Sequence, residues 1–157
     1  MLHHFASKEA LLDAVIDRLE THAQEALDRA DGLAVDSTAM LNSLMEIWHP
    51  ASHTMQLLAM LTTDAVSEDH PGRYRMSRLR RVHEHILEKC FAQLAENGQM
   101  RAGIDPPFAG RAFMDLVLGH AVREKTVRAM QKELHHDSPL EDLAKLLRAF
   151  LQPALEN

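Results

Sequence analysis

Cysteine is nearly absent from this sequence: Cys90 is the single one in 157 residues. One cysteine cannot form an internal disulfide, so the fold must be stabilised by an apolar core, as is usual in a reducing compartment. No apolar run approaches the roughly 18 to 20 residues that span a bilayer. Residues 1–5 lack the basic segment and apolar stretch of a signal peptide. These absences predict a cytoplasmic protein that does not bind membranes.

Basic residues are also in short supply. Lys and Arg number 17 against 23 Asp and Glu, which gives a net charge of −6. Surfaces that bind nucleic acids are usually basic, because Lys and Arg displace counterions from phosphates. The single basic cluster lies between residues 73 and 81 and is followed by Glu84 and Glu88, a pattern that favours a solvated helix face over a nucleic-acid patch. The chain by itself is therefore a poor candidate for a DNA-binding module.

What the sequence does contain is helical periodicity from end to end. The six glycines and six prolines fall mostly between periodic segments, and neither strand-like alternation nor an internal repeat is present. Good N-caps such as Ser7 and a natural stop at Gly98 mark helix ends. We expect an all-α bundle of about six helices. The expected helices span residues 7–32, 36–48, 50–66, 73–96, 105–134 and 138–155.

Two of these helices have unusually broad apolar surfaces. The third is apolar on nearly every side, which is typical of a central helix in a bundle. The last has an apolar stripe covering about half its circumference, so we expect a second partner beyond its own core, most simply a second copy of the chain. Gly119 would permit close approach in the fifth helix. The alternative is that the last helix only inserts into its own core. The predicted homodimer interface comprises Leu116, Gly119, Leu140, Leu143, Leu147, Phe150 and Leu151.

Two segments carry a family resemblance. Residues 1–11 read Met-Leu-His-His-Phe-Ala-Ser-Lys-Glu-Ala-Leu. They resemble the Leu-Tyr-x-His-Phe-x-Ser-Lys-Glu-x-Leu stretch of tetracycline-repressor-like (TetR-family) transcriptional regulators, with Met1 and Leu2 departing from the pattern. Residues 95–106 resemble the turn between that family's seventh and eighth helices. The first motif is quite specific and the second moderately so, whereas the rest of the likeness is architectural.

The resemblance implies a division of the chain and a role for each part. Residues 1–6 would be the end of a DNA-recognition helix, and residues 7–157 a ligand-binding and dimerisation domain. Family members read operator DNA with three N-terminal helices that this sequence lacks almost entirely, so operator binding would need those residues. A fragment, a shortened gene model and a natural loss are all compatible with this. The chain is expected to serve a ligand-responsive regulator, acting as a repressor, in which residues 7–29 transmit the effector signal.

By the same resemblance, the helices surround a pocket for a small apolar or aromatic effector. No metal site is expected, because the histidines form no metal-binding motif, and no cofactor is expected. His83 and His120 lie within apolar stripes. Each could be a core histidine bonded to a carbonyl or to a carboxylate such as Glu124, or a polar group that orients a ligand. The predicted ligand-binding residues are Trp48, Met55, Leu58, Met76, Leu79, His83, Ile86, Phe113, Val117 and His120.

Two other hypotheses remain at this stage. The first is a metal-dependent or small-molecule-binding helical enzyme that uses His83, Cys90, His120 and Glu124. Against it, the sequence has no His-Glu-x-x-His or Cys-x-x-Cys motif, no phosphate loop and no nucleophile elbow, so we expect no enzymatic activity. The second is a dimerisation module with a filled core and no cavity.

Overall fold

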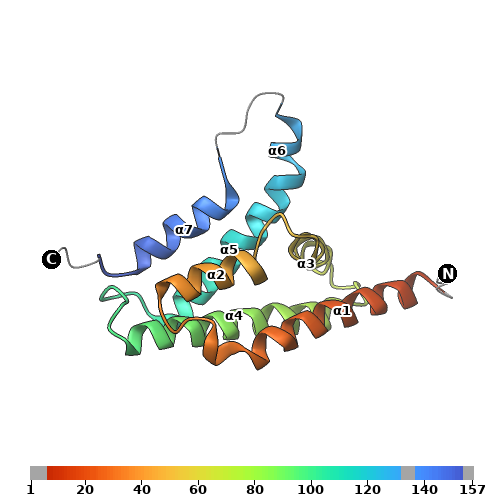
Figure 1. Cartoon of the computed structure of the whole chain (residues 1–157). Helices are drawn as coiled ribbons and strands as arrows, with labels where there is room; N and C mark the ends of the chain where they lie inside the picture. Colours follow the sequence, from red (N-terminus) through yellow and green to blue (C-terminus); the bar gives the residue numbers. More distant parts are fainter. Residues whose placement is uncertain (1–6, 132–136, 154–157) are drawn as a thin grey trace.

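The computed structural model describes residues 7–131 and 137–153, and within these ranges the chain is helical with no β-strand (Figure 1). Six α-helices have eleven residues or more, so the all-α prediction of about six helices is confirmed. No described helix combines the length and apolarity needed to cross a bilayer. Residues 1–6, assigned above to a DNA-binding domain, lie outside the described ranges. The elements are α1 (Lys8–Asp28), the 3₁₀ turn η1 (Ala30–Gly32), α2 (Ser37–Ile47), α3 (His53–Asp64), α4 (Arg73–Glu96), α5 (Pro106–Lys125), the short α6 (Val127–Met130) and α7 (Pro139–Phe150).

Side-chain caps set most of the helix starts. The side-chain oxygens of Ser7, Asp36, Ser52, Asp105 and Ser138 each accept a hydrogen bond from a backbone N–H in the first turn, at 3.1, 2.7, 3.2, 2.8 and 3.4 Å. These bonds satisfy N–H groups that have no partner within the helix. The cap at Ser52 explains one error: the third helix begins at His53, not at Pro50, and it ends at Asp64 rather than Val66.

The fifth helix is shorter than predicted. It ends at Lys125 instead of reaching Leu134, which itself lies outside the described residues. Thr126 leaves helical geometry with φ −117° and ψ −84°, and its hydroxyl donates to the carbonyl of Val122 at 2.9 Å. A threonine that bonds to its own preceding turn bends a helix, and here the four residues of α6 follow the break.

The last helix also ends early, at Phe150 rather than near Leu155. Leu151 is extended and forms an isolated antiparallel bridge with Met100. On either side of it the N–H of Arg101 donates to the carbonyl of Phe150 at 2.9 Å, and the N–H of Gln152 donates to that of Gln99 at 2.7 Å. Residues preceding a proline avoid helical geometry, so the proline after Gln152 was a stop signal that the sequence offered.

Helices α4 and α5 form the centre of the molecule, and the other elements pack around them. They lie so close at Gly110 that a Cβ there would stand 2.9 Å from the carbonyl oxygen of Glu84 and 3.1 Å from the backbone nitrogen of Glu88. Gly119, where close approach was expected, has nothing within 4 Å of a Cβ in this chain. Figure 1 shows α1 running alongside α4, with α7 over α5 and α2.

A cluster of phenylalanines fixes α7 on this pair. The ring of Phe91 in α4 lies 5.1 Å from that of Phe113 in α5, measured between centroids, and Phe150 of α7 lies 6.1 and 5.7 Å from these two. All three side chains are buried. Aromatic pairs in such tilted and edge-on arrangements contribute beyond the area they bury, so the end of α7 belongs to the core of its own chain.

The close contact between α4 and α5 leads to a first prediction. Gly110→Ala should lower the free energy of unfolding by about 1 to 3 kcal/mol, because two backbones must separate to admit the methyl group. Arg111→Ala is the control at an exposed position of the same helix, and it should change the free energy of unfolding by less than about 0.5 kcal/mol. Urea unfolding of both variants measures the difference, and equal midpoints for the two would contradict the contact.

Candidate ligand-binding site: hollows on both sides of helix α3

Helix α3 has more apolar surface than its neighbours cover. Met55 and Leu58 are buried, whereas Leu57 is half-buried and Met60 is 54% exposed. The expectation of a wholly central helix is therefore wrong for this face. Apolar side chains left uncovered beside a concave surface are typical of ligand sites, and hollows lie on both sides of α3.

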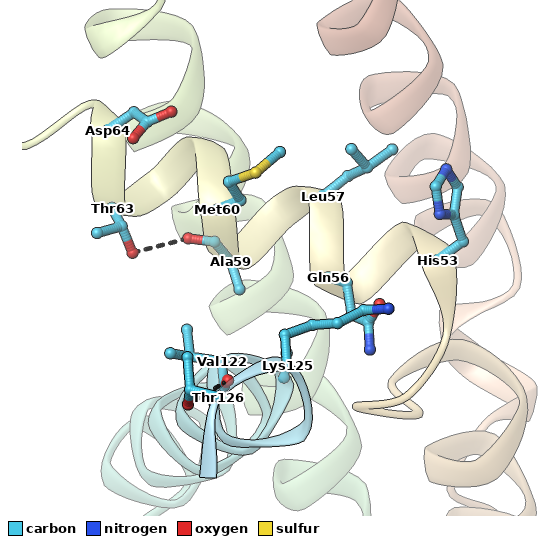
Figure 2. A pocket seen from close by; sticks show the side chains of 11 residues that line it. His53, Gln56, Leu57, Ala59, Met60, Thr63, Asp64, Val122, Lys125 and Thr126 are labelled. Carbon is cyan, nitrogen blue, oxygen red and sulfur yellow. Dashed lines mark hydrogen bonds between the residues drawn. The ribbon is translucent and has the colours of Figure 1, made fainter. Parts of the chain in front are cut away.

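The first hollow is a groove between α3 and the end of α5, shown in Figure 2. Its volume is about 490 Å³, within the range of about 300 to 1,000 Å³ that small-molecule pockets occupy. It is open at the surface, because Met60 and Val122 remain largely exposed. The groove is lined by His53, Gln56, Leu57, Ala59, Met60, Thr63, Asp64, Ala121, Val122, Lys125 and Thr126.

The polar groups of this groove divide into two kinds. The hydroxyls of Thr63 and Thr126 donate to carbonyls of their own helices, both at 2.9 Å, so their protons are already bonded. The side chains of His53, Gln56 and Lys125 make no hydrogen bond or ion pair with any residue that the structure describes. These three are the groups that a polar part of a ligand could meet.

The second hollow, of about 400 Å³, lies between α1 and α3. It shares His53 and Leu57 with the groove, so the two hollows meet across α3. An occupant here would touch α1 directly. The lining residues from α1 are Val15, Asp17, Arg18, Leu19, Thr21, His22 and Glu25.

A third hollow, of about 510 Å³, lies between the end of α3 and the start of α4 and holds part of the basic cluster. Its charges are largely neutralised within the protein. Arg80 pairs with Glu84 at 3.2 Å and with Asp115, and Arg81 lies 3.8 and 3.6 Å from Glu84 and Glu88. This arrangement supports the interpretation of the cluster as a solvated helix face.

A polar centre is formed by Trp48, which follows α2, by His83 of α4 and by His22 of α1. The indole N–H of Trp48 donates to Nδ1 of His83 at 3.1 Å, and His83 is only 1% exposed. Since Nδ1 accepts, the proton of the neutral ring lies on Nε2. Burial, together with the nearby ring of His22 at 6.3 Å, lowers the pKa of His83 to about 4. Nε2 of His22 is itself buried and unpartnered within the described residues, so this centre is only partly satisfied.

The ten predicted ligand-binding residues lie mostly in packed core. Nine of them are at most 2% exposed. Met76 is the one that reaches any of the three hollows described here. Sequence reasoning missed Gln56, Leu57, Val122 and Lys125 of the groove. The signal that was present is the apolarity of α3 on all its faces. The nine buried residues are Trp48, Met55, Leu58, Met76, Leu79, His83, Ile86, Phe113 and Val117.

His120, the tenth, has a structural partner. Its Nε2 lies 2.8 Å from a carboxylate oxygen of Asp142, which joins α5 to α7. The carboxylate is not that of Glu124, which pairs with Arg128 at 3.0 Å. A histidine bound to a carboxylate between two helices is accounted for by packing and needs no ligand.

The four residues of the enzyme hypothesis do not converge on a site. Among the described residues, no group of three or more His, Cys, Asp or Glu side chains is placed to hold a metal ion. His83 bonds to Trp48 and Glu124 to Arg128. Burial raises the pKa of the Cys90 thiol to about 12, so it stays protonated at neutral pH and is a poor nucleophile.

The predicted dimer interface divides into two groups. Leu143, Leu147 and Phe150 are buried within their own chain and have almost no surface left for a partner, because the last helix inserts between α2 and α5. Leu116, Leu140 and Leu151 stay partly exposed and Gly119 is exposed. Any symmetric contact through α5 and α7 must therefore use this second group.

Comparison of the chain with models of protein families, with curated proteins and with solved structures found no match. The family resemblance therefore depends on residues 1–11 and 95–106 alone. Most of the first segment lies outside the described residues. The features that bear on function are therefore the hollows and the helices that border them.

The buried histidine predicts a pH-dependent stability. The unfolded chain protonates residue 83 near pH 6.5, whereas the folded chain does so only near pH 4. As the pH falls through this window the unfolded state binds the extra proton, so the free energy of unfolding decreases by about 3 kcal/mol in total. His83→Gln, whose amide oxygen can still accept from Trp48, should remove that part of the decrease.

Urea unfolding between pH 7 and pH 4.5, followed by the fluorescence of the single tryptophan, measures this effect. His85→Gln is the matched control, because His85 is an exposed histidine two residues away on the same helix. It should keep the wild-type pH dependence. If His83→Gln also kept the wild-type pH dependence of the free energy of unfolding, the pKa of His83 would not be lowered in the folded protein.

Proposed function

We propose that this chain is the ligand-binding and dimerisation body of a cytoplasmic, TetR-like transcriptional regulator, acting as a repressor. The observation that supports this best is the hollow between α1 and α3. A ligand there contacts α1 directly, and α1 begins at Lys8, within the segment of residues 1–11 that resembles the family's link to its DNA-reading helices. Binding could therefore move the helix that leads to the DNA.

Helix α1 is held by a buried apolar face and by an acidic edge. Its buried residues are Ile16, Leu19, Ala23 and Ala26. Its acidic edge is fixed by one guanidinium: Arg75 of α4 pairs with Asp13 at 3.4 Å, with Asp17, and with Glu20 at 2.8 Å. These carboxylates raise the pKa of Arg75 above its usual value. Partly exposed ion pairs contribute little net stability and can re-form at low cost.

The proposed mechanism is a population shift. An effector that binds better to one position of α1 shifts the equilibrium toward it by its difference in affinity for the two positions. In a dimer the two α1 helices would each lead to a DNA-reading domain, so their displacement changes the separation of those domains and the affinity for an operator. The DNA contacts themselves belong to residues outside this sequence.

A specific observation favours a second candidate function. The residues predicted to line an interior pocket instead fill the core, as expected of a dimerisation module that binds no ligand. The two candidates share the dimer and differ in the occupancy of the hollows beside α3. Native mass spectrometry of the purified chain distinguishes them, because a dimer with an added mass of a few hundred daltons supports the regulator and a bare dimer supports the module.

The dimer leads to a separate prediction. Leu116→Glu should convert it to a monomer, because this half-buried side chain lies on the exposed part of the predicted interface and a buried unpaired carboxylate is costly. Val66→Glu is the control: Val66 is 77% exposed, beyond the end of α3, and its variant should stay dimeric. Light scattering after gel filtration gives both masses. A monomeric wild type would overturn the dimer.

The role in transcription is tested on the longest reading frame that contains this chain. That protein should retard DNA fragments from the region upstream of its own gene in a gel-shift assay, with an affinity that falls steeply as salt is raised. The chain of 157 residues alone should not bind, because its net charge is −6. If the longer protein also fails to bind double-stranded DNA, the proposed role in transcription is wrong.

A further inference from the structure

One cation at the groove between α3 and α5 forms no ion pair within the part of the chain that the structure describes. At the end of α5, Arg123 pairs with Asp137 and Glu124 with Arg128. Lys125, the next residue, forms no ion pair with any residue that the structure describes, and it lines the groove. A cation in the last turn also stabilises its helix, but that role requires no groove beside it.

The surroundings of Lys125 favour a negative partner. Gln56 and His53, in the first half of α3, line the same groove, and their side chains form no hydrogen bond with any described residue. Gln56 offers two N–H donors. The N-terminal end of α3 adds the positive end of its dipole. Asp64 is the one acidic residue of the lining. It lies at the other end of α3, about 12 Å from Gln56 along the helix axis.

The rest of the groove is apolar. Its floor and walls are formed by Leu57, Ala59, Met60, Ala121 and Val122, and the two threonine hydroxyls are bonded to backbone. Methionine adapts to ligands of variable shape. The groove therefore pairs an apolar surface with a single cationic end.

We propose that this groove binds a monocarboxylate with an apolar body. The carboxylate lies at Lys125 and accepts from the amide of Gln56, while the body covers Met60 and Val122. The claim that this ligand is the effector rests on the proposed function. The claim that the groove binds it depends only on the groove. A neutral ligand would leave Lys125 without a partner, and a cationic one would be repelled by it.

The experiment uses three eight-carbon probes that share one tail: octanoate, 1-octanol and octylamine. Isothermal titration should show that octanoate binds about tenfold more tightly than octanol, because hydrogen bonds to charged groups contribute more than neutral ones. Octylamine should bind more weakly than either. Equal affinities of octanoate and octanol would overturn the proposal.

Variants test which residues bind the carboxylate and which bind the apolar tail. Lys125→Met should weaken octanoate about tenfold and leave octanol unchanged, whereas Lys125→Arg should keep the preference for octanoate. Met60→Gln should weaken both probes. The matched control is Lys89→Met, since Lys89 is an exposed lysine of α4 that lines none of the three hollows. If Lys125→Met folds and binds octanoate as the wild type does, the proposal is wrong.

Two further measurements keep the interpretation unambiguous. Amide shifts in the NMR spectrum on adding octanoate should concentrate in α3 and the end of α5, and shifts confined to other helices would overturn the site. Thermal unfolding of Lys125→Met separates a loss of helix stability from a loss of binding.

The binding site and the proposed function can fail independently. If octanoate binds at Lys125 but leaves the gel shift of the longer protein unchanged, the binding site is correct and its role as the effector site is wrong. If the longer protein binds no DNA at all, the proposed function fails and the site is unaffected.

Discussion

The rest of the structure depends on the close contact of α4 and α5 at Gly110. With no side chain at that position, the two central helices meet backbone to backbone beside Glu84 and Glu88. The helices that surround this pair then have fixed places: α1 and α3 pack against α4, α3 also packs against α5, and α7 covers α5. A wider spacing of α4 and α5 would displace the phenylalanine cluster between them and release the end of α7.

The hollows described above lie outside the densely packed centre. The nine large side chains that the sequence predicts as a pocket lining are almost fully buried, and Met76 alone among them lines one of the three hollows. These hollows lie where α3 borders α1, α4 and α5. Helix α3 is only twelve residues long, and it has apolar faces that its neighbours do not fully cover.

The position of α3 also connects the two proposals made for this chain. His53 and Leu57 line both the groove beside α5 and the hollow beside α1. A molecule bound in either hollow therefore contacts side chains that also line the other hollow. Among the ion pairs described, Arg75 alone binds the acidic edge of α1. The buried centre of Trp48 and His83 lies close by and adds a dependence of stability on pH.

The sequence by itself determined the class of fold, most helix starts and the place of α4, because caps, prolines and apolar periodicity act over only a few residues along the chain. The proline after Gln152 also indicates that the last helix ends before residue 152. Only the tertiary structure decided which apolar faces meet. The same periodicity that predicts a buried stripe does not say whether its partner is α5, a ligand or a second chain, so Phe150 and Leu143 were assigned to a dimer and lie in the core. Lys125 became a candidate only when the fold paired Arg123 and Glu124 with other residues and left Lys125, which has no ion pair among the described residues, beside an apolar groove.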